Sequence, residues 1–318
     1  MENHKLYKKI AYWYYKLGLT QDEIAKRLSL TRQKVNQIIN SLIELGVVSI
    51  VINGYEDHDA FLENYLEETY QLKQAIVVNA YEEEDEERIF KGVTEAAARH
   101  LERIIQKKSI IGVSWGIALT SAIGQMRTKR RPECKVVQMI GAQDTSEAAM
   151  RTDEIARLLA DKLDCPSYML YAPVIVDNPE TKTALLNEKY IQRIFDYIRS
   201  CDIAIVGIGE LTEGATICKR GLLSIEDIHA LRGQGFCADI CFNAVSPNGS
   251  GENSCISDRV IGADLNILRK IPNVVAIVAG MEKKDAVEGA LRSGCIDTLI
   301  IDARIVEYIY KKNTEKKT

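Results

Sequence analysis

Short apolar runs alternate with helical stretches from residue 109 onward, and this alternation restricts the fold more than any other feature of the chain. The runs predict short buried strands, separated by helices such as those expected over residues 147–163 and 188–200. Strands that alternate with helices favour a largely parallel, doubly wound α/β sheet. The predicted strands comprise residues 109–113, 135–140, 168–171, 203–206, 235–240, 274–278 and 298–301, with a further strand-like run at residues 75–78.

The length and composition fit one small and one large domain. The chain has 318 residues, of which 46% are hydrophobic and 27% are charged, the balance of a globular protein. No apolar run approaches the ~20 residues that span a bilayer, and the N-terminus lacks the apolar stretch of a signal peptide. We therefore expect a cytoplasmic protein without a membrane segment.

The cysteine pattern predicts reduced thiols. Eight cysteines are scattered between Cys134 and Cys295, without a Cys-x-x-Cys pair. Cys237 and Cys241 are close enough in sequence to face one metal ion, but the nearest histidine, His229, does not complete a zinc ligand set. We expect neither a metal nor a cofactor.

The charge is unevenly distributed along the chain. Residues 1–53 contain eight Lys and Arg against four Asp and Glu, which gives a net charge of +4. Since the whole chain carries −4, the remainder carries −8. A basic head on an acidic body suits a protein that binds DNA through its head, because neutralisation of phosphates drives nucleic-acid affinity.

The first 42 residues predict three short helices. The first spans residues 6–17 and ends at Gly18, and Thr20 and Thr31 are the predicted N-caps of the second and third, because a threonine hydroxyl accepts a first-turn N–H. Apolar residues recur at helical spacing in each helix. The inward faces comprise Ile10, Tyr14 and Leu17 in the first helix, Ile24, Ala25 and Leu28 in the second, and Val35, Ile38, Ile39 and Leu42 in the third.

The outward face of the third helix carries side chains that suit DNA recognition, since Arg, Gln, Asn and Lys contact base edges or phosphates. A short helix, a tight turn and a polar-faced helix form the helix-turn-helix arrangement, and residues 45–52 predict a strand that adds a small wing. The alternative is a three-helix interaction module whose polar face meets only water. We predict a DNA-binding domain over residues 1–53, with Thr31, Arg32, Gln33, Lys34, Asn36 and Gln37 in contact with operator DNA.

Residues 54–318 are predicted to form a second domain for effector binding and oligomerisation. A helical pattern that includes residues 61–72 follows Gly54 and is expected to bridge the two domains. The acidic run 82–87 is interpreted as a solvated helix start, because acidic side chains there complement the helix dipole. No binding role is expected of this run.

Small-residue loops follow several predicted strands, and ligands of such sheets bind beyond the carboxyl ends of the strands. Residues 112–116 and 279–285 each lead from a strand into a helix, where free amides attract a phosphate, and Lys283 or Lys284 adds an ammonium group. Asp239 ends another predicted strand and suits sugar hydroxyls. Each feature taken singly also fits an ordinary turn, cap or solvated helix start, so their convergence at one sheet edge carries the prediction. The further loops at this edge are residues 141–143, 172–173 and 207–209.

With these segments assembled, the chain resembles the SorC family of sugar-responsive transcriptional regulators over essentially its whole length. Four segments carry the resemblance: the helix-turn-helix over residues 19–36, the Gly-Val-Ser-Trp-Gly loop at 112–116, the strand and loop at 202–209, and residues 280–291. The resemblance implies a second domain similar to the glucosamine-6-phosphate deaminase and ribose-phosphate isomerase folds. It also implies a homo-tetramer, or a dimer, that binds operator DNA.

Carried over position by position, the resemblance implies a phosphorylated sugar effector. The 112–118 loop and Lys283 would hold the phosphate, and Gln143 with Asp239 would hold the sugar end. The expected effector-binding residues are Gly112, Ser114, Trp115, Gly116, Gln143, Gly209, Asp239 and Lys283.

Two departures from the family pattern bear on the ligand. Ala118 stands where family members commonly have Thr, which removes a phosphate-binding hydroxyl that Ser114 or Thr120 could replace. Residues 240–249 differ from the family's usual Gly-rich segment, which could alter the choice of sugar.

The main alternative is an enzyme, a sugar-phosphate isomerase or deaminase with Asp239 as base and Lys283 as phosphate ligand. Its acid/base chemistry lacks a histidine beside the predicted mouth, because His100 and His229 fall in helical stretches. A DNA-binding head also has no purpose in a plain isomerase. A third alternative is an interaction module with a vestigial sugar pocket. We predict a non-enzymatic transcriptional regulator.

Overall fold

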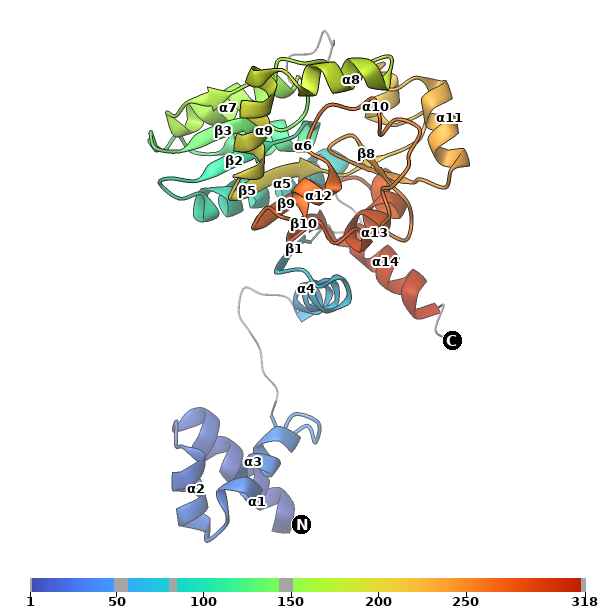
Figure 1. Ribbon diagram of the computed structural model, residues 1–318. Coiled ribbons are helices and arrows are strands. Elements are labelled where there is room, and N and C mark those ends of the chain that lie inside the picture. Colours follow the sequence, from blue (N-terminus) through green and yellow to red (C-terminus); the bar gives the residue numbers. More distant parts are fainter. Residues whose placement is uncertain (1, 49–56, 80–84, 143–150, 316–318) are drawn as a thin grey trace. The chain divides into compact units, whose positions relative to one another are not determined.

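The computed structural model describes residues 2–48, 57–79, 85–142 and 151–315 (Figure 1). The chain divides into two compact units, Met1–Asp57 and His58–Thr318, and each is described by itself below. The domain boundary expected at residues 53–54 lies outside the described residues.

Among residues 2–48, three α-helices and one π-helical turn form the N-terminal unit. The elements are α1 (Glu2–Ala11), the π-helical turn Tyr12–Lys16, α2 (Gln21–Leu28) and α3 (Arg32–Ser41). Thr20 begins α2 through a reciprocal capping box with Glu23, and the Thr31 hydroxyl accepts the Lys34 N–H at the start of α3. Both predicted N-caps are therefore confirmed. The core of this unit is formed mainly by Ile10, Ile24, Val35, Ile38, Ile39 and Leu42.

The predicted first helix is not continuous. It becomes a π-helical turn at Tyr12, where the Leu17 N–H donates to the Tyr12 carbonyl five residues back. The wider turn breaks the 3.6-residue spacing on which the predicted inward face rests. Leu17 is consequently 53% exposed, and its predicted place in the core is wrong.

The predicted wing is only partly described. Residues 42–48 form turns and a bend after α3, and Gly46 has a φ of 65°, which suits a chain reversal that a Cβ would strain. The remaining wing residues, 49–52, lie outside the described residues.

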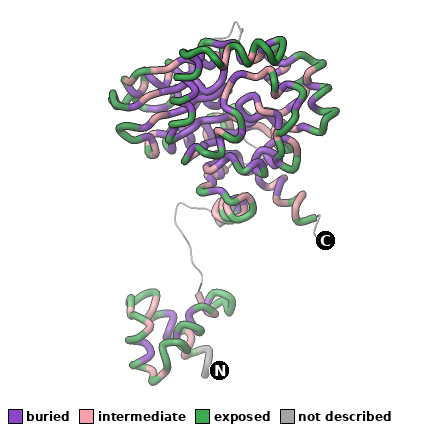
Figure 2. The backbone as a smooth tube through the Cα atoms, viewed as in Figure 1, coloured by how far each residue is buried: buried purple, intermediate pink, exposed green. Residues whose placement is uncertain are grey.

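A seven-stranded parallel sheet forms the centre of the described C-terminal unit, in the order β1-β10-β9-β5-β2-β3-β4. Adjacent residues of β5, β9 and β10 are buried, so both faces of the sheet are covered. Figure 2 shows buried residues in purple through the interior of this unit. The strands are β1 (Gln74–Val78), β2 (Ile110–Val113), β3 (Lys135–Gln138), β4 (Ser167–Tyr168), β5 (Ile203–Gly207), β9 (Asn273–Val278) and β10 (Thr298–Asp302).

Helices connect these strands, as a parallel sheet requires. The predicted doubly wound α/β fold is confirmed. The helices are α4 (Asp57–Tyr70), α5 (Glu86–Ile104), α6 (Ile117–Gln125), α7 (Thr152–Leu163), α8 (Pro179–Leu186), α9 (Lys189–Arg199), α10 (Thr216–Lys219), α11 (Ile225–Gly233), α12 (Leu265–Leu268), the 3₁₀ turn Met281–Lys283, α13 (Lys284–Arg292) and α14 (Ala303–Glu315).

The predicted strand over residues 235–240 does not join the main sheet. Its ordered part, β7 (Ala238–Ile240), pairs antiparallel with β6 (Gly209–Glu210) and β8 (Asn243–Val245) in a separate small sheet. Cys241 and Phe242 both have φ above +50°, so β7 and β8 form a hairpin with a two-residue turn. A hairpin partner is local in sequence, and this turn lacks the Asn-Gly signal that predicts one.

Two other predicted elements are shorter than expected. The strand expected over residues 168–171 coincides with β4 only at Tyr168. Helix α7 begins at Thr152, and residues 147–150 of its predicted start lie outside the described residues. In the described part of the chain, no helix is long and apolar enough to cross a membrane.

Candidate functional site

The outward face of α3 presents the predicted DNA-contacting side chains to solvent. Thr31, Arg32, Gln33, Lys34, Asn36 and Gln37 are all exposed. The intervening Val35, Ile38 and Ile39 are buried in the core of the N-terminal unit. The helix therefore offers one polar face on a rigid support, which is the arrangement that a recognition helix needs.

A contact that the sequence analysis missed orients this face. The Gln21 amide donates to Asn36 Oδ1 at 3.0 Å and so ties the first residue of α2 to α3. Asp22 also lies near the guanidinium of Arg32, at 3.8 Å. One hydrogen-bonding atom of Asn36 is thus already engaged within the protein, whereas among the described residues no side-chain partner of Gln33 or Gln37 is seen.

A cavity of about 600 Å³ lies at the carboxyl ends of β2, β5 and β9. These strands are close neighbours in the sheet order, so their exit loops meet at one edge. Five of the eight predicted effector residues line the cavity. They are Trp115, Gly116, Gly209, Asp239 and Lys283.

The N-terminus of α6 forms one wall of this cavity. Gly116 is its N-cap, with a φ of 145° and no side-chain cap, and residues Ile117 to Leu119 also line the cavity. The first backbone N–H groups of a helix lack intrahelical partners, so this wall presents free donors and the positive end of the helix dipole. Both properties attract an anion.

Asp239 reaches the cavity from the small sheet. Its side chain is only 4% exposed, and burial raises its pKa to about 7, against the lowering effect of a hydrogen bond from the Phe242 N–H. Gly209 makes room for the carboxyl group, because a Cβ at this position would lie 3.3 Å from Asp239 Oδ2. Near neutral pH the carboxyl group is present in both forms, so it accepts or donates hydrogen bonds.

Lys283 supplies a cation to the same cavity from the turn that leads into α13. Its Nζ donates to the Ala279 carbonyl at 2.8 Å and lies 3.7 Å from Glu282 Oε1. The ammonium group is therefore held beside the end of β9. Lys284, the alternative in sequence, does not line the cavity, and its ammonium lies over the Tyr308 ring.

Two predicted residues are placed inside the protein rather than at the cavity. A Cβ on Gly112 would collide with Met139, so this glycine serves the packing of β2 against β3. Ser114 is buried and does not line the cavity, and the Thr120 hydroxyl donates to the Gly116 carbonyl at 3.1 Å. Neither hydroxyl therefore takes the place of a threonine at position 118. Gln143 lies outside the described residues.

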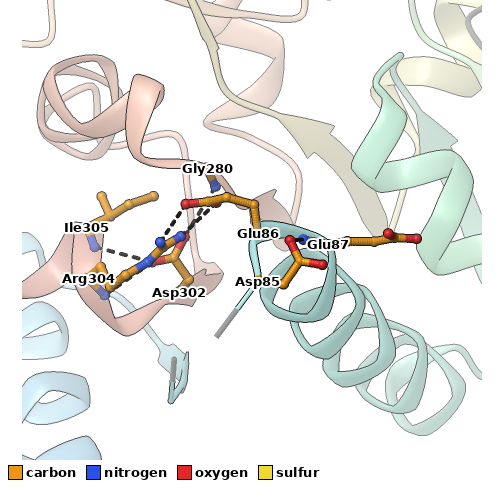
Figure 3. A network of polar contacts seen from close by, with 7 residues as sticks. All are labelled: Asp85, Glu86, Glu87, Gly280, Asp302, Arg304 and Ile305. Atoms are coloured by element: carbon orange, nitrogen blue, oxygen red, sulfur yellow. Dashed lines mark hydrogen bonds and ion pairs between the residues drawn. The ribbon is translucent and has the colours of Figure 1, made fainter. Parts of the chain in front are cut away.

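The acidic run contributes to the cavity, contrary to its interpretation as merely a solvated helix start. Glu86, Glu87 and Phe90, from the first turns of α5, line the cavity wall. Figure 3 shows Glu86 directed at Arg304 and Glu87 directed away from it. Only the tertiary fold brings α5 to this edge, since its sequence shows no more than an acidic helix start.

The rest of the described C-terminal unit offers weaker candidates for a site. A second cavity, of about 540 Å³, is lined mainly by α9, α12 and residues 250–269, and contains none of the predicted effector residues. Among the described residues, no cluster of three His, Cys, Asp or Glu could hold a metal ion. The eight cysteines are unpaired.

Two family models match the chain. Residues 57–311 match the one described as "Putative sugar-binding domain", and residues 18–49 match one described as winged helix-turn-helix DNA-binding. The deoxyribonucleoside regulator of Bacillus subtilis is 29% identical over 302 residues, which cover 95% of this chain and 96% of the relative. The sorbitol operon regulator of Klebsiella pneumoniae is 26% identical over 318 residues, which cover 98% and 100%.

Solved structures agree with these matches. The full-length sorbitol operon regulator SorC of Klebsiella pneumoniae superposes with a TM-score of 0.74 at 25% identity and covers 97% of this chain and 99% of its own. A DeoR family transcriptional regulator from Listeria monocytogenes has the same TM-score at 32% identity, and covers 80% and 100%.

Proposed function

The chain belongs to the SorC family of transcriptional regulators, and on that premise we propose that a phosphorylated sugar binds its cavity and controls its affinity for operator DNA. The chain joins a helix-turn-helix to a sugar-binding domain. The observation that carries the proposal is a cavity at the carboxyl ends of the strands, where free helix amides, an ammonium and a buried carboxyl group face the same space.

The phosphate is assigned to the α6 wall and Lys283. Backbone N–H groups from Gly116 onward and the Lys283 ammonium offer donors and positive charge. Glu87 of the α5 wall lines the same cavity, so a phosphate is repelled from that wall. The ligand is therefore oriented, with its phosphate at the α6 end.

The sugar hydroxyls are assigned to Asp239. A carboxyl group whose pKa is about 7 accepts from or donates to a hydroxyl, and in a buried place each such bond is strong. Gly209 lets this group approach the ligand. Gln143, whose structure is not described, remains a predicted partner of the sugar.

Operator DNA is assigned to the exposed face of α3. We assign Gln33 and Gln37 to base edges, and Arg32 and Lys34 to phosphates or guanine. We further propose a homo-tetramer or dimer in the cytoplasm, because paired recognition helices match the two-fold symmetry usual in operators. Light scattering of the full chain measures its oligomeric state.

The effector is tested with matched pairs of sugars. Thermal unfolding and operator affinity are measured with ribose 5-phosphate, 2-deoxyribose 5-phosphate, glucose 6-phosphate and fructose 6-phosphate, and with the four unphosphorylated sugars. The DNA is a duplex selected from random sequence by the full-length protein. We expect a phosphorylated probe to raise the melting temperature and change the operator Kd, because a ligand that binds only the folded state stabilises it. If no phosphorylated probe does either, the proposal is wrong.

A matched pair of variants locates the phosphate. Lys283→Met is expected to weaken binding of the active phosphosugar about tenfold or more, as loss of a charged hydrogen-bond donor does. Lys284→Met removes the neighbouring charge outside the cavity and should leave the affinity nearly unchanged. Equal losses in both variants would contradict the assignment.

A second candidate function is sugar-phosphate isomerisation, and the pKa of Asp239 favours it, because a general base works best with a pKa near the working pH. Conversion of ribose 5-phosphate to ribulose 5-phosphate by the full chain would support this candidate. Turnover that is absent in wild type and in Asp239→Asn alike leaves regulation as the function of the site.

A further inference from the structure

A network of charged groups lies where β10 passes into α14. The Arg304 guanidinium contacts both oxygens of Glu86, at 2.6 and 3.0 Å, and its Nε lies 3.3 Å from Asp302 Oδ1. Asp302 is fully buried and also accepts the Gly280 N–H at 3.2 Å (Figure 3). We call these four residues, Glu86, Gly280, Asp302 and Arg304, the Arg304 network.

The Arg304 network joins two walls of the proposed effector cavity. Glu86 belongs to the α5 wall, and Gly280 begins the turn that carries Lys283. Gly280 has a φ of 103°, which only glycine adopts easily. The hydrogen bond from its N–H to Asp302 helps to hold the turn in this conformation. Movement of either wall therefore changes the hydrogen bonds of Arg304 or Asp302.

The same network begins α14, and α13 is fastened to that helix along its length. The Tyr308 hydroxyl donates to Asp285 Oδ1 at 3.0 Å, and the Lys312 ammonium lies 3.0 Å from Glu288 Oε2. Glu288 is buried in α13. The cavity turn, α13 and α14 are thus bound to one another by charged contacts rather than by apolar packing alone.

The far end of α14 contacts α4, the first helix after the N-terminal unit. The Tyr310 ring packs edge-on against Phe61 and Tyr65, with centroids 5.1 and 5.0 Å apart. The Asn313 amide donates to the hydroxyls of Tyr65 and Tyr70, at 3.1 and 3.3 Å. A single helix therefore contacts the cavity walls at its start and α4 near its end.

We propose that Arg304 is a positioning residue that couples the cavity walls to α4 through α14. The proposal rests on the proposed function for its biological meaning, because α4 is the element through which the chain continues from the DNA-binding unit. A ligand that moves the Lys283 turn or the start of α5 changes the geometry of the bidentate ion pair between Arg304 and Glu86. Since helices are stiff, a shift at Ala303 reaches Tyr310 and Asn313.

The Arg304–Glu86 ion pair should fix local geometry more than it raises the free energy of global unfolding. The Glu86 carboxyl group is largely solvent-exposed, and exposed ion pairs contribute little to global stability. The Arg304 guanidinium, however, is bidentate and its side chain is mostly enclosed, which fixes geometry strongly. Loss of the Arg304–Glu86 pair should therefore loosen particular segments more than the whole fold, whereas loss of Arg304 itself also leaves the buried Asp302 without its cation and lowers global stability.

Hydrogen–deuterium exchange of the full-length protein without any sugar tests this coupling. Arg304→Met should speed amide exchange about tenfold or more in residues 280–283 and in α4, because local opening becomes cheaper. Arg259→Met is the matched control, since Arg259 also pairs with a carboxylate, Asp227, at 2.8 Å and is 27% exposed against 22% for Arg304. In the control, exchange in α4 should equal that of wild type.

Two further variants keep the test decisive if Arg304→Met fails to fold. Glu86→Gln changes only an exposed carboxyl group and should loosen α4 to a smaller extent, and its effect should not add to that of Arg304→Met. Asn313→Ala should loosen α4 and, because coupling is reciprocal, should also speed exchange in residues 280–283 to a smaller extent. If Arg304→Met or Glu86→Gln speeds exchange at the cavity without any change in α4, the coupling does not exist. Because no sugar is present, this result is independent of the effector experiment.

Discussion

Replacement of Asp239 by asparagine should make stability respond differently to pH. Burial raises the pKa of Asp239 from 3.8 to about 7. An unfolded chain releases this proton near pH 4, whereas the folded chain retains it until about pH 7, so wild-type stability falls as the pH rises between those values. Above pH 7 the folded carboxyl group is ionised as well, and the loss levels off.

The magnitude follows from the size of the shift. A difference of about 3 pKa units corresponds to about 4 kcal/mol at 1.36 kcal/mol per unit, which is an upper bound at pH 8. Asparagine keeps an oxygen for the Phe242 N–H and has almost the same shape, but it never ionises. Relative to wild type, Asp239→Asn should therefore gain stability from near zero at pH 4 to a few kcal/mol at pH 8.

Urea unfolding at several pH values measures this difference. The chain has two tryptophans, and a Trp13→Phe background leaves Trp115, at the cavity, as the fluorescent reporter of the C-terminal unit. Asp196→Asn, on a side chain that is 75% exposed, is the control and should show no such trend. A stability gain of Asp239→Asn that stays constant from pH 4 to pH 8 would refute the argument from burial.

Three further predictions follow from the two units. Gln33→Ala should reduce discrimination between selected and random DNA, whereas Lys34→Ala should weaken binding to both and lower its salt dependence, as fluorescence anisotropy at several salt concentrations would show; equal effects of Gln33→Ala on both DNAs would contradict its role. Thr20→Ala removes the capping box of α2 and should cost about 1 kcal/mol, visible as earlier melting followed through Trp13; an unchanged transition would show that the cap is dispensable. Gly112→Ala should destabilise the C-terminal unit by about 1–3 kcal/mol through its collision with Met139, measured by urea unfolding, while unchanged stability with weakened sugar binding would return Gly112 to the ligand site.

Local patterns were sufficient for much of the fold. Capping at Thr20 and Thr31, the polar face of α3 and the apolar strands of the main sheet all depend on neighbours within a few residues, which the sequence displays directly. The predictions fail where an element does not depend only on neighbours within a few residues. Leu17 follows a π-helical turn that shifts the helical spacing, and residues 238–240 pair with local strands outside the main sheet.

The residues of the effector cavity also fall into a group that the sequence predicts and a group that it does not. Its glycines and the helix start at Gly116 belong to strand exits, whose place at the sheet edge follows from parallel topology alone. Asp239, in contrast, reaches the cavity from another sheet than the one expected, and Ser114 is turned inward. The direction of a side chain next to a strand end depends on packing, which a linear pattern does not encode.

From the order of residues alone, a basic helix-turn-helix ahead of an acidic, parallel α/β body could be derived, because charge, capping and periodicity are properties of short segments. Folding alone brought Glu86 to Arg304 across 218 positions and placed the start of α5 at the same cavity as the Lys283 turn. Contacts so distant in sequence form when a sheet orders its strands, so neither the acidic wall nor the route from cavity to α4 is visible before the chain is folded.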